Sequence, residues 1–258
     1  SLTVSLSNSS ASSVTVDWAS ANGTATAPAD YTSASGALTF TSGQTSKTVT
    51  ITINDDALNE ADETLTVGLS NATNATIADN SGIITITDND PIPTIQFTQS
   101  TQSVAEDVGT VTLTAQLSAA SGRDISVPVA YSGTATGSGT DYTASSGTLS
   151  ITAGQTTGTV TLTIVDDLIY ETNETVIATM GTPVNATLDT TSVQTVTITN
   201  NDSQPSITID DLTVGESDGN AVVTVHLSNP SYQSITVDWA TANGSAVSAT
   251  DYTAGSGT

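Results

Sequence analysis

Residues 159–174 read TVTLTIVDDLIYETNE, and residues 48–63 read TVTITINDDALNEADE. In both stretches threonine alternates with apolar residues before a pair of aspartates, and two glutamates follow. Alternation with a period of two is typical of a β-strand that buries one face. A pattern that returns after roughly 110 residues indicates a tandem array of domains of that size.

Two further motifs recur in step with this one. The pair Asp30-Tyr31 returns as Asp141-Tyr142 and again as Asp251-Tyr252. The triplet Asp88-Asn89-Asp90 returns as Asn200-Asn201-Asp202. Each repeat therefore carries its own set of acidic residues, and the repeat is the unit to interpret.

These motifs divide the chain into three units, joined by short linkers that contain proline. Unit one (residues 1–90) lacks its first strand, unit two (residues 91–202) is complete, and unit three (residues 203–258) is truncated after its third strand. Two explanations are open. The chain is a window cut from a longer array, or a neighbouring chain supplies the missing strand at an open sheet edge.

Period-two patterning within unit two predicts seven short strands and no helix. They span residues 94–98, 109–117, 125–131, 147–151, 159–165, 175–180 and 193–199. Seven short strands in about 110 residues are typical of a two-sheet, immunoglobulin-like sandwich. The predicted fold is all-β, with such sandwiches joined end to end.

Composition excludes several function classes. Against 26 acidic residues the chain has only Lys47 and Arg123, and its formal charge is −24. Such a chain repels nucleic acid and anionic membrane surfaces. It has no cysteine, no long apolar run for membrane insertion and no pattern of a signal peptide. No base or nucleophile constellation recurs, so we expect no catalytic residues and no enzyme activity.

The recurrent acids are expected to meet at one end of each sandwich. If every strand reverses direction, alternate turns fall at the same end, and these turns carry the acids. Side-chain alternation places Val160, Leu162 and Ile164 on one face with Asp166, over the end of the core. Closely packed carboxylates repel by roughly 1 kcal/mol or more per pair, and Ca²⁺ favours clusters of such oxygens. The competing interpretation is a solvated surface of turn-forming aspartates.

At this point the sequence resembles the Calx-beta domain, a calcium-binding sandwich of sodium/calcium exchangers and of tandem arrays in microbial surface proteins. The resemblance rests on Glu106, Asp141-Tyr142, the stretch 166–174 and the triplet at residue 200. It implies that the matching residues bind several Ca²⁺ ions at one end of each unit. The implied ligands are Asp30, Asp55, Asp56, Glu60, Glu63, Asp88, Asn89, Asp90, Glu106, Asp141, Asp166, Asp167, Glu171, Glu174, Asn200, Asn201, Asp202, Glu216 and Asp251.

The leading hypothesis is a structural array, a stalk or filament segment of an extracellular microbial surface or matrix protein that calcium stiffens at the junctions between units. One alternative is a calcium-sensing regulatory pair. Another is an adhesin that binds a glycan or protein through residues 118–124 or 182–192. Expected partners are neighbouring repeats, with further copies of the chain or host and matrix ligands as other candidates. Strand exchange at the truncated ends would make such a chain assemble into fibres.

Overall fold

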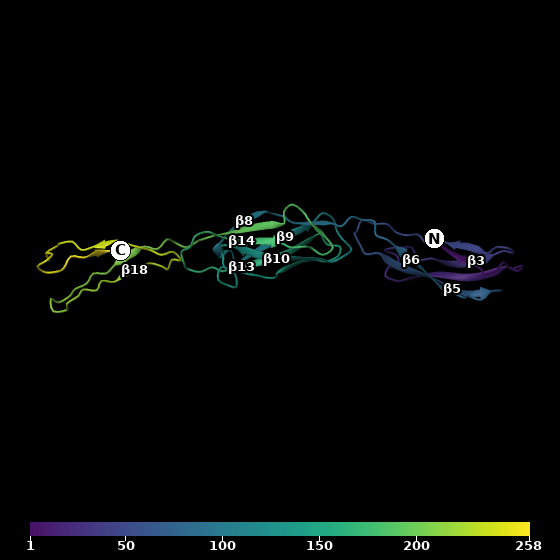
Figure 1. Cartoon of the computed structure of the whole chain (residues 1–258), viewed down its shortest axis with the longest axis horizontal. Helices are drawn as coiled ribbons and strands as arrows, with labels where there is room; N and C mark the ends of the chain where they lie inside the picture. Colours follow the sequence, from purple (N-terminus) through teal and green to yellow (C-terminus); the bar gives the residue numbers. More distant parts are fainter.

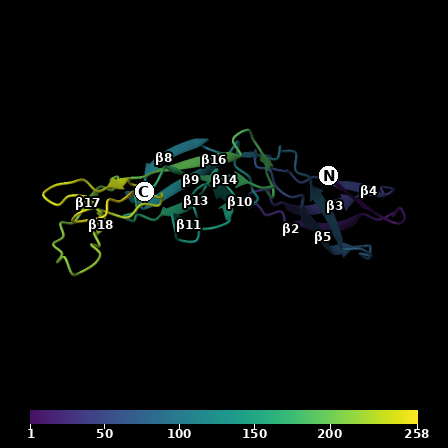
Figure 2. The same cartoon turned by 60° about the vertical axis from the view of Figure 1, so that its left-hand side comes forward.

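The computed structural model describes all of residues 1–258. Its three units follow one another along the long axis of the molecule, with units one and three at opposite ends (Figures 1 and 2). Apart from one turn of 3-10 helix, every regular element is a β-strand, which confirms the predicted all-β class. The structure contains no helix whose length and apolar character would let it cross a membrane.

Unit two is a sandwich of two five-stranded sheets. Its strands are β7 (Thr94–Phe97), β8 (Thr101–Ala105), β9 (Thr110–Leu117), β10 (Ile125–Gly133), β11 (Tyr142–Ala144), β12 (Thr148–Ile151), β13 (Thr157–Ile164), β14 (Glu174–Met180), β15 (Thr187–Leu188) and β16 (Val193–Thr199). One sheet has the order β12-β10-β14-β16-β8, and the other has the order β11-β13-β9-β7-β15. The predicted sandwich is therefore observed.

The first strand of unit two differs from its prediction. The sequence predicts a single strand over residues 94–98, whereas the chain forms β7 and β8 in opposite sheets. β7 pairs antiparallel with β9, and β8 pairs parallel with β16. The polar residues between Phe97 and Thr101 have no alternation to hold them in either sheet. By crossing over, the chain covers one strand in each sheet that would otherwise be an open edge.

Strands β11 and β15, three and two residues long, were not predicted either, because periodicity is not detectable over so few residues. The apolar residues that were predicted to lie on the inner face of the strands do form the core. Val160, Leu162 and Ile164 are at most 4% exposed, and they belong to a continuous cluster of 22 buried residues. Burial of this apolar surface is the main source of stability for unit two.

Unit one has fewer strands and a smaller core of 10 buried residues. Its strands are β1 (Leu2–Ser5), β2 (Val14–Asn22), β3 (Ser35–Phe40), β4 (Ser46–Val49), β5 (Glu63–Thr73) and β6 (Ser81–Ile86). They form a four-stranded sheet, β3-β2-β5-β6, and a pair, β1-β4. Counterparts of β7 and β8 are absent, so β1 and β6 each have an unpaired edge.

Unit three has little core. Its strands are β17 (Ile207–Ile209), β18 (Val225–Leu227), β19 (Trp239–Ala240) and β20 (Ser256–Gly257), which form two separate pairs. Trp239 is 54% exposed and Ile209 is 66% exposed. Their neighbours in a complete sandwich would be counterparts of β13, β14 and β16, which residues 203–258 do not include.

Units one and two meet through hydrogen bonds to a backbone carbonyl oxygen. The Asn59 carbonyl oxygen, in the loop before β5, accepts hydrogen bonds from the Ser121 hydroxyl at 2.9 Å and from the Gly122 amide at 3.1 Å. Ser121 and Gly122 belong to the loop between β9 and β10 of unit two. A loop of one unit thus docks on a loop of the next.

The junction between units two and three has the same design. The Tyr170 carbonyl oxygen accepts hydrogen bonds from the Ser231 hydroxyl at 3.4 Å and from the Tyr232 amide at 3.1 Å. The Tyr170 amide donates to the Pro230 carbonyl oxygen at 3.1 Å. Because Asn59 and Tyr170 occupy the same position in successive repeats, the docking geometry is a property of the repeat.

Candidate metal centre

Six carboxylates gather at the end of unit two that faces unit three. The carboxylate oxygens of Glu106, Asp167 and Asp202 lie within 4.8 Å of one another, and those of Asp141, Glu171 and Glu174 form a second group of the same size. The two groups are neighbours, since the Glu171 carboxylate interacts with Asp141 of one and with Asp167 of the other. All six belong to the set that the sequence analysis selected.

Strand pairing explains how residues so far apart in sequence meet. β8 runs parallel to β16 with Ala105 opposite Thr199, so the residues that follow both strands emerge side by side. Glu106 opens the 3-10 helix after β8, and Asp202 follows β16. The antiparallel pairing of β14 with β16 brings Glu174 opposite Ile198 at the same end. The cross-over of the first strand is therefore what delivers Glu106 to the cluster.

Two of these oxygens are buried without a hydrogen-bond partner. They are Oε2 of Glu106, a residue only 6% exposed, and Oδ2 of Asp202. A buried carboxylate oxygen without a donor is energetically costly unless a cation or a proton binds it. The one ion pair in the structure joins His226 to Asp210, so neither Lys nor Arg neutralises the cluster. The unpaired oxygens point to a cation as the missing partner.

The recurrent aspartate before the tyrosine also has a local role. An oxygen of Asp30 accepts hydrogen bonds from the Thr26 amide at 2.6 Å and from the Thr26 hydroxyl at 3.1 Å. Asp141 accepts one from the Thr136 amide in the same way. These bonds close the turn, as expected for turn-forming aspartates. The carboxylates of Asp30 and Asp141 also interact with Glu63 and Glu174, so each closes a turn and lines the cluster.

Crowding and burial shift the acid equilibria of these groups. Burial first, and then repulsion from Asp167 and Asp202, raises the pKa of Glu106 to about 7. Burial, followed by a hydrogen bond and repulsion from Asp141, raises the pKa of Glu174 to about 7. Burial and neighbouring acids also raise the pKa of Glu171. The metal-free cluster consequently binds protons at a pH where ordinary carboxylates are ionised.

We expect the metal-free protein to lose stability as the pH rises from about 5 to about 8. A carboxyl group whose pKa is raised on folding stabilises the folded state while protonated, and this contribution disappears as the pH passes the folded-state pKa of about 7. Thermal unfolding in the presence of a chelator measures the effect. Glu106→Gln should flatten the pH dependence, and an unchanged profile in this variant would contradict the assignment to Glu106.

Unit one has a similar cluster of carboxylates, but it lacks a residue equivalent to Glu106. Oxygens of Asp30, Glu60 and Glu63 lie within 4.8 Å of one another. The predicted ligands of unit one line one small hollow, namely Asp30, Asp55, Asp56, Glu60, Glu63, Asp88, Asn89 and Asp90. Burial and neighbouring acids raise the pKa of both Glu60 and Glu63. No counterpart of Glu106 reaches this hollow, because the strand that would carry it is absent.

Two predicted ligands of unit two also make hydrogen bonds to the acidic loops. The side-chain carbonyl oxygen of Asn200 accepts a hydrogen bond from the Glu171 amide at 3.2 Å, and its amide group donates to the Asp202 carbonyl oxygen at 3.0 Å. The amide group of Asn201 donates to Asp166 at 3.1 Å. These hydrogen bonds connect the acidic loops to one another, and the bond of Asn201 uses its NH₂ group and leaves its side-chain carbonyl oxygen, the expected ligand atom, out of the contact.

In unit three, neither Glu216 nor Asp251 belongs to a group of three or more acids whose oxygens lie within 4.8 Å of one another. Asp251 still closes its turn by accepting a hydrogen bond from the Val247 amide at 2.8 Å. Glu216 is exposed and lies in a loop between β17 and β18. A cluster at this end would need the later strands of the sandwich.

Sequence analysis missed three supporting residues. Asn59, only 6% exposed, donates hydrogen bonds to Asp88 at 2.8 Å and to the Asp90 carbonyl oxygen at 3.1 Å. The Asp62 side chain accepts a hydrogen bond from the Asp88 amide at 3.1 Å. The Asn173 side chain accepts one from the Asn200 amide at 3.2 Å. Asp62 and Asn173 occupy equivalent positions in their repeats, and that recurrence is the signal that could have found them.

The donor set suits a hard cation. It consists of carboxylate oxygens from several loops, with no histidine or cysteine, and Ca²⁺ prefers six to eight such oxygens in a flexible geometry. Glu106, Asp167 and Asp202 would hold one ion, and Asp141, Glu171 and Glu174 another. The unpaired oxygens of Glu106 and Asp202 are the observation that favours this fit over a solvated acidic surface.

Comparison with known families agrees with this fold. The model of the Calx-beta domain family matches residues 1–90, 88–202 and 200–258, which together span the chain. The chain therefore belongs to the Calx-beta family. No curated protein matches it significantly.

Among solved structures, the chain is similar to CBD12 from CALX1.2, with 21% identity and a TM-score of 0.38 over 76% of this chain and 91% of that chain. The calcium binding domain CBD12 of CALX1.1 gives 18% identity and a TM-score of 0.35 over the same shares. The apo form of the Calx CBD1 domain gives 23% identity and a TM-score of 0.40, covering 43% of this chain and all of that domain. The family assignment rests on the sequence match along the whole chain.

Proposed function

We propose that this chain is a calcium-binding structural array, a stalk or filament segment of an extracellular microbial surface or matrix protein. One observation carries the proposal, namely that a single loop holds both the acids and the contact to the next unit. Glu60 follows Asn59, which docks on unit two, and Glu171 follows Tyr170, which docks on unit three. An ion that orders this loop therefore also orders the junction.

The electrostatics give the direction of the effect. Without a cation, the clustered carboxylates repel one another and loosen the loops that bear them. Bound Ca²⁺ would replace this repulsion by attraction and hold the docking residues in place. Outside cells, where calcium is millimolar, sites with dissociation constants of about 10⁻⁴–10⁻³ M are substantially filled. The elongated arrangement of the three units suits a spacer or stalk (Figure 1).

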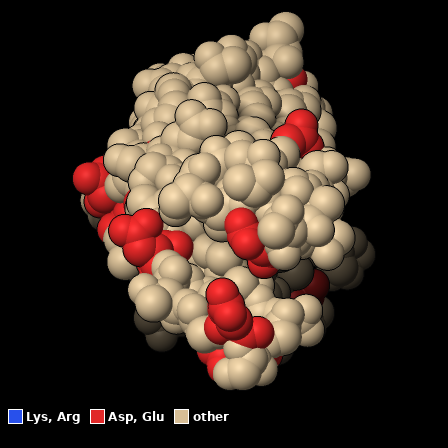
Figure 3. All heavy atoms as spheres, turned by 90° about the vertical axis from the view of Figure 1, so that its left-hand side faces the viewer, with Lys and Arg blue, Asp and Glu red and all other residues tan.

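The surface charge does not favour nucleic acid as a partner. The face at the end of unit three carries scattered Asp and Glu and shows no Lys or Arg (Figure 3). The loop of residues 118–124, a candidate adhesive loop, is in contact with Asn59 of unit one. Its remaining free surface is correspondingly smaller for a glycan or a protein ligand.

Small-angle X-ray scattering of the full chain tests the proposal. We expect a narrow distribution of extended shapes in millimolar CaCl₂ and a broader, more flexible distribution in a chelator. The double variant Asp30→Asn with Glu60→Gln should keep the first junction flexible even with calcium, because it removes two of three clustered carboxylates. Asp17→Asn, which removes one acid outside the cluster, is a control for the loss of a surface charge. Identical scattering with and without calcium would contradict the proposal.

A calcium-sensing pair is the second candidate, since the ligand-bearing loop makes the junction contacts and could change the angle between units. The calcium concentration at the midpoint of a binding titration distinguishes a stalk from a sensor. A midpoint near 10⁻⁴ M or weaker fits a stalk that is filled outside cells, and a midpoint below about 10⁻⁵ M fits a sensor.

A further inference from the structure

We infer that Gly122 of unit two is a positioning residue for the ion site of unit one. Because it has no side chain, it leaves room for the side chain of Glu60, and unit two closes over Glu60 without displacing it from its carboxylate group. The residue that follows Ser121, the serine that docks on unit one, thus decides how unit two bears on its neighbour's ion site. The inference deepens the proposed function and rests on calcium binding in unit one.

The side chain of Glu60 lies directly against Gly122. A Cβ atom at residue 122 would lie 2.6 Å from Cγ of Glu60 and 2.9 Å from its carboxyl carbon, and one carboxylate oxygen would be closer still. Carbon atoms that are not bonded to one another pack at about 3.5–4.0 Å. Alanine at residue 122 would therefore force either the Glu60 side chain or the docking loop of unit two to move.

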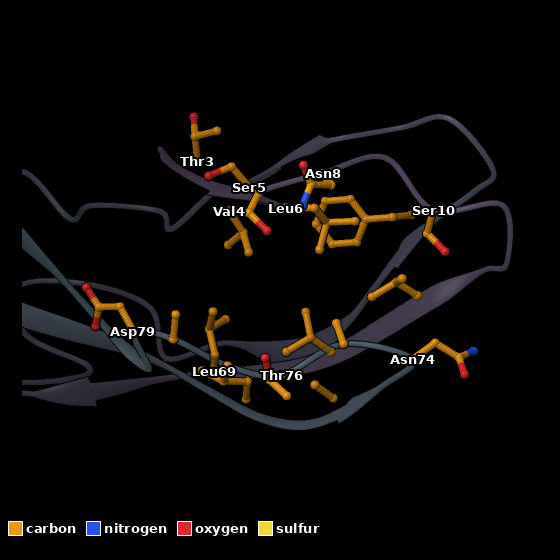
Figure 4. Close-up of a pocket in the computed structure, with 18 of the residues that line it drawn as sticks. Thr3, Val4, Ser5, Leu6, Asn8, Ser10, Leu69, Asn74, Thr76 and Asp79 are labelled. Carbon is orange, nitrogen blue, oxygen red and sulfur yellow. The ribbon is translucent and has the colours of Figure 1, made fainter.

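The turn that carries Gly122 does not itself require glycine. In every unit, the side chain of a serine in this turn accepts a hydrogen bond at 3.1 Å from the amide two residues later. Figure 4 shows this serine in unit one, Ser10, in the loop between β1 and β2. The residue after the serine is Ala11 in unit one and Tyr232 in unit three. Gly122 is also not one of the glycines with a positive φ, so the contact with Glu60 is what explains it.

Hydrogen bonds hold the backbone on both sides of this contact. The Gly122 amide donates to the Asn59 carbonyl oxygen at 3.1 Å, and the Ser121 hydroxyl donates to the same oxygen at 2.9 Å. Asp88 accepts a hydrogen bond from the Glu60 amide at 3.1 Å and one from the Asn59 side chain at 2.8 Å. Because Asn59 and Ser121 are at most 6% exposed, moving either backbone would leave buried polar groups without partners. The Glu60 side chain is therefore the part that moves most easily.

The same side chain belongs to the ion site. A carboxylate oxygen of Glu60 lies within 4.8 Å of oxygens of Asp30 and Glu63, and Glu60 lines the acidic hollow of unit one. Rotation of the side chain away from residue 122 would displace this oxygen from the group. Alanine at residue 122 should consequently weaken ion binding in unit one, although it leaves the core and every acid of the hollow in place.

The second junction provides an internal comparison. There Tyr232 occupies the position of Gly122, and Glu171 occupies the position of Glu60. The Glu171 carboxylate nevertheless belongs to its own group of three carboxylates. It reaches this group with a tyrosine as the neighbouring residue, so it needs no glycine there. We therefore expect the dependence on residue 122 to be a property of the first junction alone.

Calcium titration of the full chain, followed by nuclear magnetic resonance at single backbone amides, tests the inference. The Glu60 amide reports on unit one and the Glu171 amide on unit two. Gly122→Ala should raise the dissociation constant of unit one by about tenfold, as is typical when a metal ligand loses its support, and should leave unit two unchanged. Gly147→Ala is the matched control, because a Cβ there would have no neighbour closer than 3.8 Å. Tyr232→Ala, at the same position of the second junction, should also change neither constant.

A double-mutant cycle shows whether Glu60 carries the effect. Once Glu60→Ala has removed the side chain, Gly122→Ala should change the calcium affinity of unit one by less than about twofold, because no side chain is left to displace. An undiminished loss of affinity in the Glu60→Ala background would mean that residue 122 acts by another route and would overturn the inference.

Two further results separate this inference from undocking and from the proposed function. The amide of residue 122 donates to Asn59, so its hydrogen exchange should remain slow in Gly122→Ala. Fast exchange would mean that the units have separated, which would overturn the positioning role. Equal calcium affinity of unit one with and without Gly122→Ala would also overturn it, but would leave the proposed function in place. If calcium binds to neither unit of the unsubstituted chain, both are wrong.

Discussion

In about 10 mM CaCl₂ the unfolding midpoint of unit two is expected to lie roughly 10 °C above its value in a chelator, and Glu106→Gln should remove most of this rise. A ligand at 100 times its dissociation constant stabilises the folded state by about 2.7 kcal/mol, which corresponds to a rise of this size in a domain of about 110 residues. Glu106 is chosen because its buried Oε2 has no other partner. Calorimetry of the full chain measures the midpoint.

The sign of the Glu106→Gln effect should differ between the two conditions. Without calcium at about pH 8, the variant removes a buried charge that repels Asp167 and Asp202, so the metal-free protein should become more stable. With calcium, the same variant loses a ligand and should become less stable than the unsubstituted protein. A substitution that only damaged packing would be destabilising under both conditions.

Asp107→Asn is the matched control for this experiment. Asp107 is the next residue in the same 3-10 helix, is exposed, and is not part of either carboxylate group. It changes the net charge by the same amount as Glu106→Gln, and it should leave the response to calcium nearly intact. If both variants lose the same part of the calcium-dependent rise in unfolding midpoint, calcium stabilises the protein through its overall charge and not through a defined site.

The sandwich and its inward-facing rows could be predicted because they depend on a local pattern. Residues such as Val160 and Leu162 alternate with threonine along the strand, and the apolar residues of this alternation are the buried ones. The cross-over from β7 to β8 could not be predicted in this way. It depends on which sheet edge is free, and that is a property of the assembled sandwich and not of residues 94–105.

The site was predictable to the same extent. Recurrence identified the acids and strand direction placed them at one end, but the sequence did not show which oxygens would be used locally. Asn200 illustrates the limit, since its carbonyl oxygen accepts a hydrogen bond from the Glu171 amide. The supporting role of Asn59 was hidden for a similar reason. Its counterpart is Tyr170, so the side chain differs while the backbone contact to the next unit recurs.

Gly133→Ala is expected to destabilise unit two by about 3 kcal/mol and to weaken calcium binding. Gly133 ends β10 with φ at +125°, a conformation that residues with a side chain rarely adopt. A Cβ atom there would lie 2.1 Å from the Thr175 carbonyl oxygen of β14, so the two strands would have to separate. The residues that follow lead to Thr136, which holds Asp141, and the displacement would reach the cluster.

Gly147→Ala is the control, because its Cβ would meet nothing closer than the Val129 carbonyl oxygen at 3.8 Å. It should change the unfolding free energy by no more than about 0.5 kcal/mol. Denaturant unfolding with a calcium titration of each variant measures both effects, and equal stability of the two variants would contradict the steric argument. The same glycine recurs as Gly23, where a Cβ would lie 2.3 Å from the Thr64 carbonyl oxygen, and as Gly244, where nothing lies within 4 Å. Since the neighbouring strand is missing only around Gly244, alanine should be costly at residues 23 and 133 and tolerated at residue 244, which ties the penalty to the strand that also carries Glu63 and Glu174.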